Sequence, residues 1–221
     1  MDPTERTGVF RHGRDLYTLN AVPGQRVYGE DLRIESGAEY RRWDPFRSKL
    51  AAFLLKSTTR AWSKSPQGVL YLGAAHGTTV SHLSDAFPSV PIFAVEKSPV
   101  AFAPLLALAR IRSNLLPILA DAQLPERYAA DVGEVDFLYQ DVAQRTQAEI
   151  FHENARACLA AGGLGLLMLK VRSVTQARSS RAVLGEARSY LERQGWSVLE
   201  SLDLVPFSRE HVALLLRPDR A

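Results

Sequence analysis

Three features of the sequence predict an α/β fold with a mostly parallel, seven-stranded sheet. From Val69 onward, short apolar segments alternate with segments of helical periodicity. The apolar segments are continuous, which is typical of strands that are buried on both faces of a parallel sheet. The last two, 196–204 and 211–217, are joined by a short link, so we expect them to pair antiparallel. The sheet therefore ends in a hairpin and has helices on both faces.

The parallel part of the sheet consists of five expected strands with four helices between and after them. The strands are 69–73, 91–96, 115–120, 135–141 and 164–171, and the helices are 78–86, 99–112, 146–160 and 180–194. We expect the third helix to end at Gly162 and Gly163, because glycine commonly stops a helix. Five β/α units closed by a hairpin are typical of the Rossmann-like class I S-adenosylmethionine-dependent methyltransferases, whereas a dehydrogenase more often continues as β-α-β.

Residues 1–43 differ from the rest and predict a small N-terminal β-rich region. Four short β-prone pieces, 8–13, 16–19, 27–29 and 32–34, are separated by turn-forming residues. No long flexible linker follows them. We therefore expect an antiparallel sheet that packs against the methyltransferase domain, residues 44–221.

An amphipathic helix is expected where the second region begins. Asp44 is the expected N-cap and Pro45 the first helical residue. The apolar stripe of this helix is formed by Phe46, Leu50, Phe53 and Leu54. Lys49 lies beside the stripe, and taken alone it is an ordinary surface lysine.

The composition describes a protein without a membrane span or a secretion signal. The 221 residues contain no uninterrupted apolar run long enough to cross a bilayer, and the N-terminal residues lack an apolar signal core. We therefore expect a cytoplasmic protein. The single cysteine, Cys158, is expected in the core rather than as a nucleophile. The net charge of +3 and the excess of arginine over lysine agree with nucleic-acid binding, but equally with a general preference for arginine.

Polar residues gather where the expected strands end, and that edge is where α/β sheets bind ligands. Gly73 ends the first strand and is followed by Thr78 and Thr79, either of which can cap the next helix. Glu96 ends the second strand at roughly the 20-residue spacing at which an acid meets ribose hydroxyls. The next three strands end at Asp121 and Ala122, at Asp141 to Gln144, and at Lys170.

This arrangement of acids favours one kind of ligand. Glu96 or Asp121 alone would be read as a helix-capping acid, but acids at three strand ends beside a glycine turn suit a nucleoside with positive charge near its reactive centre. A phosphate-rich ligand such as NAD or ATP would favour the opposite charge balance. The pattern therefore predicts S-adenosyl-L-methionine as the cofactor.

Several stretches resemble the fibrillarin family, in particular its archaeal RNA 2′-O-methyltransferases. They span nearly the whole chain and include Tyr28-Gly-Glu30, Glu39-Tyr-Arg-Arg-Trp-Asp-Pro-Phe-Arg-Ser-Lys-Leu-Ala-Ala52, Val69-Leu-Tyr-Leu-Gly-Ala-Ala-His-Gly-Thr-Thr79, Tyr139-Gln-Asp-Val-Ala-Gln144 and Lys170-Val-Arg-Ser173. The resemblance implies S-adenosylmethionine-dependent methylation of ribose 2′-hydroxyls in rRNA and tRNA. It also implies a box C/D guide ribonucleoprotein, with a Nop-family scaffold protein, a kink-turn-binding ribosomal-type protein, a guide RNA and the target RNA as partners.

The resemblance further implies a catalytic set that maps onto Lys49, Asp141, Lys170 and His211. The chemistry agrees, because an ammonium stabilises a developing alkoxide and a carboxylate takes or relays its proton. We expect Lys170 to lower the pKa of the ribose hydroxyl and Asp141 to hold that lysine. Lys49 and His211 would support them, and the identity of the formal base stays open.

The expected cofactor-binding residues are Gly73, Thr78, Thr79, Glu96, Lys97, Asp121, Ala122, Asp141, Val142, Ala143 and Gln144. Three positions depart from the family pattern, which has a smaller residue at His76, an aromatic residue at Lys97 and an acid at Gln140. Lys97 thus replaces a ring that could stack on adenine. Three arginines that follow Lys170, namely Arg172, Arg178 and Arg181, are candidate phosphate contacts or ordinary surface residues. The histidines lack partners at ligand spacing, so we expect no metal.

Two functions other than RNA methylation remain open for this sequence. A methyltransferase that acts on a small molecule would not require the set of Lys49, Asp141 and Lys170. A ribonucleoprotein subunit without catalytic activity would keep the fold as a docking surface. Loss of Asp141 or Lys170 would favour this second alternative, and both residues are present.

Overall fold

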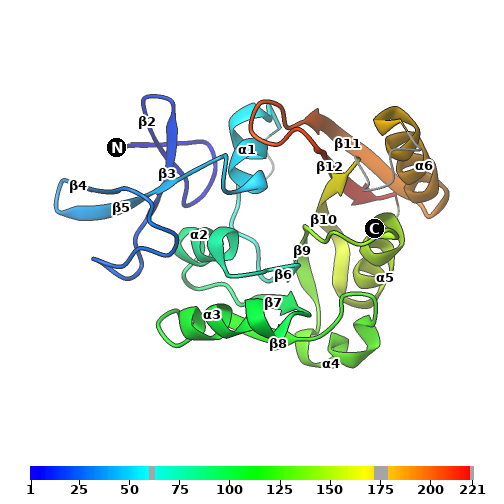
Figure 1. Cartoon of the computed structure of the whole chain (residues 1–221), viewed down its shortest axis with the longest axis horizontal. Helices are drawn as coiled ribbons and strands as arrows, with labels where there is room; N and C mark the ends of the chain where they lie inside the picture. The colour runs from blue at the N-terminus through cyan, green and yellow to red at the C-terminus, as the bar shows by residue number, and fades with distance from the viewer. Residues whose placement is uncertain (60–62, 172–178, 220–221) are drawn as a thin grey trace.

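A computed structural model describes residues 1–59, 63–171 and 179–219, and its largest element is a seven-stranded sheet (Figure 1). The spatial order is β11-β12-β10-β9-β6-β7-β8. The strands are β6 (Val69–Leu72), β7 (Ile92–Glu96), β8 (Leu115–Leu119), β9 (Val135–Gln140), β10 (Leu159–Lys170), β11 (Trp196–Asp203) and β12 (His211–Pro218). Neighbours from β8 to β10 pair parallel, whereas β12 is antiparallel to both β10 and β11. The predicted fold class and the closing hairpin are confirmed.

Helices cover both faces of this sheet. The helices are α1 (Lys49–Lys56), α2 (Thr78–Ala86), α3 (Pro99–Ala109), α4 (Ala129–Val132), α5 (Gln147–Cys158) and α6 (Ser180–Arg193), with a 3₁₀ turn at Pro125–Arg127. One buried cluster joins the side chains of α1, α2 and α3 to Val69 and Tyr71 of β6. The other joins α4, α5 and α6 to Leu70 and Leu72. Alternate side chains of β6 thus enter opposite cores, as expected for a strand with both faces covered by helices.

The N-terminal part forms a second, five-stranded antiparallel sheet in the order β1-β2-β3-β5-β4. Its strands are β1 (Asp2–Pro3), β2 (Phe10–His12), β3 (Asp15–Leu19), β4 (Leu32–Glu35) and β5 (Ala38–Trp43). The expected strand at 27–29 is wrong, because Tyr28 lies in a loop, where its hydroxyl donates to the carbonyl of Arg42. The sequence did not predict β5 as a strand.

A buried ionic network joins this sheet to α2. Arg41 of β5 is fully buried and donates to Glu30 at 2.6 Å and to Ser81 at 3.0 Å. It also pairs with Asp85, which accepts a second ionic contact from Arg112 at 3.3 Å. Because guanidinium groups are costly to bury without partners, these contacts specify how the two sheets pack together.

Two expected helix boundaries are wrong. The first helix begins at Lys49 and not at Pro45, because its N-cap is Ser48, whose hydroxyl accepts from the Ala51 N–H at 3.3 Å. Residues 44–47 form a turn, so Phe46 is 65% exposed instead of lying in the apolar stripe. Likewise, α5 ends at Cys158, and Gly162 and Gly163 lie within β10.

Candidate active site

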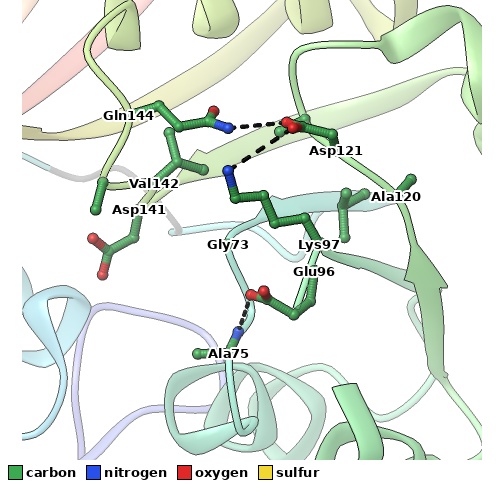
Figure 2. Close-up of a pocket in the computed structure, with 12 residues that line it drawn as sticks. Gly73, Ala75, Glu96, Lys97, Ala120, Asp121, Asp141, Val142 and Gln144 are labelled. Carbon is green, nitrogen blue, oxygen red and sulfur yellow. Dashed lines mark hydrogen bonds and ion pairs between the residues drawn. The ribbon is translucent and has the colours of Figure 1, made fainter. Parts of the chain in front are cut away.

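The carboxyl ends of the parallel strands surround a cavity of about 280 Å³ (Figure 2). Its lining comes from the ends of β6, β7, β8 and β9 and consists of Gly73, Ala75, Val95, Glu96, Lys97, Ala120, Asp121, Ala122, Asp141, Val142, Ala143 and Gln144. Most of the predicted cofactor residues are in this lining. Sequence reasoning missed Ala75, Val95 and Ala120, because small apolar residues carry no chemical signal.

Gly73 permits the turn that opens the cavity. Its φ is +82°, a region that residues with a side chain rarely adopt. A Cβ at this position would lie 2.3 Å from the carbonyl oxygen of Asp141, far below van der Waals contact. Only glycine allows the first strand end to approach the fourth this closely.

Glu96 shapes the loop after β6. One oxygen of its carboxylate accepts from the Ala75 N–H at 2.9 Å (Figure 2). The other oxygen accepts from the Ser98 N–H at 2.7 Å. A carboxylate has about four acceptor sites, so both oxygens keep capacity for ligand hydroxyls. The predicted acid at this strand end therefore lines the cavity and also holds the turn.

Thr78 and Thr79 are not in the cavity lining. They begin α2, but the N-cap is Gly77, and no side chain caps this helix. The predicted threonine cap of this helix is therefore wrong. Thr79 is buried and donates its hydroxyl to Ser48 at 3.0 Å, which ties α2 to the start of α1.

Asp121 stands on the far side of the cavity and has several donors around it. The Gln144 amide donates to its carboxylate at 3.0 Å, and the Lys97 ammonium lies 3.9 Å away (Figure 2). The N–H of Gln123 also donates to this carboxylate at 3.0 Å. The two hydrogen bonds, followed by the charge of Lys97, lower the pKa of Asp121 below its ordinary value. The carboxylate is therefore ionised at neutral pH.

Asp141 connects the cavity to a second group of charged side chains. It follows β9, lines the cavity and accepts from the Lys49 ammonium at 2.7 Å. We expected Asp141 to hold Lys170, but Lys170 pairs instead with Glu210 at 3.2 Å. Glu210 was not predicted from the sequence, because its contact depends on how β12 aligns with β10.

The charges of both ion pairs act on His211. It is directly opposite Lys170 in the antiparallel register, and its Nδ1 is 2.9 Å from the hydroxyl of Ser208. Burial, followed by the positive charge of Lys49, lowers the pKa of His211 to about 4, and the Lys170 charge acts in the same direction. At neutral pH the imidazole is therefore uncharged. The four predicted catalytic residues thus lie together at the sheet edge.

A pair of glutamines supports the end of β10. Gln147 accepts from the Lys170 N–H at 2.8 Å and donates to the Lys170 carbonyl at 3.4 Å. Gln140 is fully buried and donates to the Gln147 carbonyl at 2.7 Å. The Gln140 amide thus holds α5 against β9.

The remaining predicted residues lie elsewhere. Arg172 and Arg178 are outside the described residues, and Arg181 is exposed on α6. His76 is exposed in the loop before α2. The described residues contain no group of three or more His, Cys, Asp or Glu side chains that could hold a metal ion. In the same part of the chain, no helix has the length and apolarity to cross a membrane.

The chain is similar in sequence to known proteins over nearly its whole length. The sequence model of the family described as Fibrillarin matches residues 3–219. A fibrillarin-like rRNA/tRNA 2′-O-methyltransferase from Methanothermobacter thermautotrophicus is 40% identical over 212 residues, which is 96% of this chain and 95% of that protein. Its counterpart from Methanosarcina acetivorans is 43% identical, covering 95% of this chain and 93% of that protein.

Solved structures give the same result. Aeropyrum pernix fibrillarin with natively bound S-adenosyl-L-methionine has a TM-score of 0.85 and 40% identity, covering 94% of this chain and 97% of that one. The fibrillarin of a fibrillarin/Nop5p complex has a TM-score of 0.87 and 37% identity, covering 96% and 98%. A precorrin methyltransferase from Geobacter metallireducens, with 18% identity and a TM-score of 0.53, shares the fold alone. This chain belongs to the fibrillarin family.

Proposed function

We propose that this chain methylates ribose 2′-hydroxyls of rRNA and tRNA with S-adenosyl-L-methionine, as the catalytic subunit of a box C/D guide ribonucleoprotein. One observation carries the proposal. Asp141 belongs both to the cavity at the strand ends and to the charged group that contains Lys49, Lys170 and His211. A methyl donor held in the cavity is thereby next to groups that can activate a hydroxyl.

The cavity suits S-adenosyl-L-methionine. Glu96 and Asp121 offer carboxylate oxygens to ribose hydroxyls and to the adenine amino group, and Gly73 leaves room for the ligand's close approach. Lys97, where the family pattern has an aromatic ring, lies across the cavity beside Asp121. When bound, the cofactor supplies an electrophilic methyl group on a sulfonium. The carboxylates complement that positive charge.

The residues of this chain would activate the ribose hydroxyl. The ammonium groups of Lys49 and Lys170 stabilise the negative charge that develops on the hydroxyl oxygen. Two groups can accept its proton, namely the carboxylate of Asp141 and the uncharged imidazole of His211. Proton transfer of this kind contributes typically about 10²–10⁴-fold to a rate.

The partners follow from the family. A solved fibrillarin/Nop5p complex supports a Nop-family scaffold protein, and the resemblance extends this to a kink-turn-binding protein and to guide and target RNA. The net charge of +3 is modest for a protein that binds RNA without help, which agrees with site selection by such partners. Within the chain, residues 1–43 would form the N-terminal region and residues 44–221 the methyltransferase domain. We further propose that the protein is cytoplasmic.

Calorimetric titration with S-adenosyl-L-methionine tests the first step. We expect saturable binding by the wild type and at least about tenfold weaker binding by Asp121→Ala, because a carboxylate partner is lost. A guide-directed methylation assay with partners then tests catalysis, in which Lys170→Ala should slow methylation without weakening cofactor binding. If the wild type binds no cofactor even with the scaffold protein present, the enzyme is excluded and a docking subunit remains.

A further inference from the structure

The described part of the chain has one exposed aromatic side chain, and it lies beside the catalytic residues. Phe46 is 65% exposed, whereas all other described Phe, Tyr and Trp residues are buried or partly buried. Exposed leucines and valines are ordinary, but a phenyl ring in water is less common. Phe46 also lies just before Lys49 in the sequence. Its position therefore calls for an explanation in terms of substrate.

A second aromatic residue holds Phe46 in place. Phe207 lies in the loop between β11 and β12, and its ring centroid is 5.1 Å from that of Phe46, with an angle of 70° between the ring planes. Phe207 is partly buried and packs on the core under α1. Figure 1 shows this red-orange loop beside α1. The Lys56 ammonium donates to the carbonyl of Val205, which holds loop and helix together.

The two loops that meet here begin with the same four residue types, namely proline, phenylalanine, arginine and serine. The first reads Pro45-Phe-Arg-Ser-Lys49 and the second reads Pro206-Phe-Ser-Arg-Glu-His211, so each continues from an aromatic residue through an arginine to a catalytic residue. Arg47 and Arg209 are both exposed. The Phe46 N–H donates to Asp44 at 2.9 Å, which fixes the first loop. The two loops that carry the paired rings thus also carry exposed arginines, and the Arg47 guanidinium lies over the ring of Tyr28, 5.9 Å from its centroid.

We propose that Phe46, supported by Phe207, is a stacking platform for an unpaired nucleobase of the target RNA, and that Arg47 and Arg209 contact the adjoining phosphates. The proposal rests on the proposed function, which brings a target ribose to Lys49 and His211. Single-stranded RNA is commonly bound by aromatic stacking with arginine at the backbone. Neither ring lines the cofactor cavity, so the rings contact RNA and not the cofactor. Changes to them should leave cofactor binding unaffected.

Phe46→Leu and Phe46→Trp test the proposal in the assembled, guide-directed particle. Phe46→Leu keeps the apolar contact with Phe207 but cannot stack, so we expect about tenfold weaker binding of the target RNA. Phe46→Trp should restore it. Ile34→Leu, an exposed residue of β4 outside the site, is the matched control and should match the wild type. Calorimetric affinity for S-adenosyl-L-methionine should be the same for all four proteins.

Abasic target RNAs identify the base and separate the outcomes. Removing the stacked base should weaken binding to the wild type by the same factor, with no further loss in Phe46→Leu. If Phe46→Leu binds every target as the wild type does, the proposal is wrong. The proposal is also wrong if Phe46→Leu weakens particle assembly, or if it weakens the binding of all target RNAs equally, whether or not a base is missing. In that case a contact with a protein explains why the Phe46 ring is exposed. An inactive wild-type particle would instead contradict the proposed function itself.

Discussion

Replacement of Gly73 by alanine should damage cofactor binding more than it damages the fold. Alanine at a φ of +82° costs about 1–2 kcal/mol. The new Cβ would lie 2.3 Å from the carbonyl oxygen of Asp141, whereas real contacts of this kind begin near 3.0 Å. The loop that carries Asp141 and Val142 must therefore move by about 1 Å, and both residues line the cavity. A misplacement of that size can cost about 10²-fold in activity.

Gly77→Ala is the matched control for this variant. Gly77 has a φ of +92°, and its Cβ would also lie 2.3 Å from another atom, but that atom is the flexible tip of Leu108. The backbone strain is thus similar, while the cavity is unaffected. We expect both variants to lower Tm by roughly 2–8 °C, and only Gly73→Ala to lose at least about tenfold in calorimetric affinity for S-adenosyl-L-methionine. Equal affinities for the two variants would refute the reasoning.

Three further changes probe the contacts around the site. Gln147→Leu removes both hydrogen bonds to the Lys170 backbone, so the free energy of unfolding should fall by about 1–3 kcal/mol; Gln147→Glu keeps the acceptor and should lose less in urea denaturation. The folded-state pKa of His211 is about 4, below the unfolded value near 6.5. The contribution of its uncharged imidazole to the free energy of unfolding is therefore complete above pH 6.5 and is lost as the pH falls to 4. Because the side chain is only partly buried, we expect about 1–2 kcal/mol, and His211→Asn should flatten the pH dependence of unfolding by that amount; an unchanged slope would contradict it. Asp85→Asn leaves Arg41 and Arg112 buried without their shared carboxylate, which should cost about 3–5 kcal/mol in the same assay, and a loss below 1 kcal/mol would show that water replaces it.

The sequence predicts the ends of the strands well, because an apolar run must stop where the sheet meets solvent. Glu96, Asp121 and Asp141 each follow such a run, and parallel pairing brings all three to one edge. Placing these three acids at one edge requires no information beyond the order of the strands in the chain. The ligand cavity was therefore predictable from residues far apart in the chain.

Pairing among the charged residues was not predictable. The Lys170 ammonium meets Glu210 because the antiparallel register places His211 opposite Lys170, so the preceding residue reaches across. A one-residue shift in register would reverse which side chains share a face. Asp141 is thus left to Lys49, which comes from a helix on one face of the sheet.

The predicted start of α1 was wrong for a related reason. Asp44 and Pro45 have the local pattern of an N-cap and first helical residue, and only tertiary contact shows that Ser48 takes this role. Ser48 caps α1 and also accepts from Thr79 of α2. Asp44 and Ser48 are both suitable N-cap residues by local sequence. The additional hydrogen bond from Thr79 of α2 favours Ser48.

These contacts connect the cavity at the strand ends to Lys49, the proposed catalytic lysine, in a closed path. Gly73 packs against the backbone of Asp141, and Asp141 holds the ammonium of Lys49. Lys49 follows Ser48, which accepts from Thr79, and Thr79 lies on the helix that continues the Gly73 loop. We therefore expect a change in any one of these contacts to affect both the cavity and the position of the Lys49 ammonium. Thr79, which the sequence suggested as a cofactor ligand, instead acts from outside the cavity, because it fixes the helix that presents Lys49.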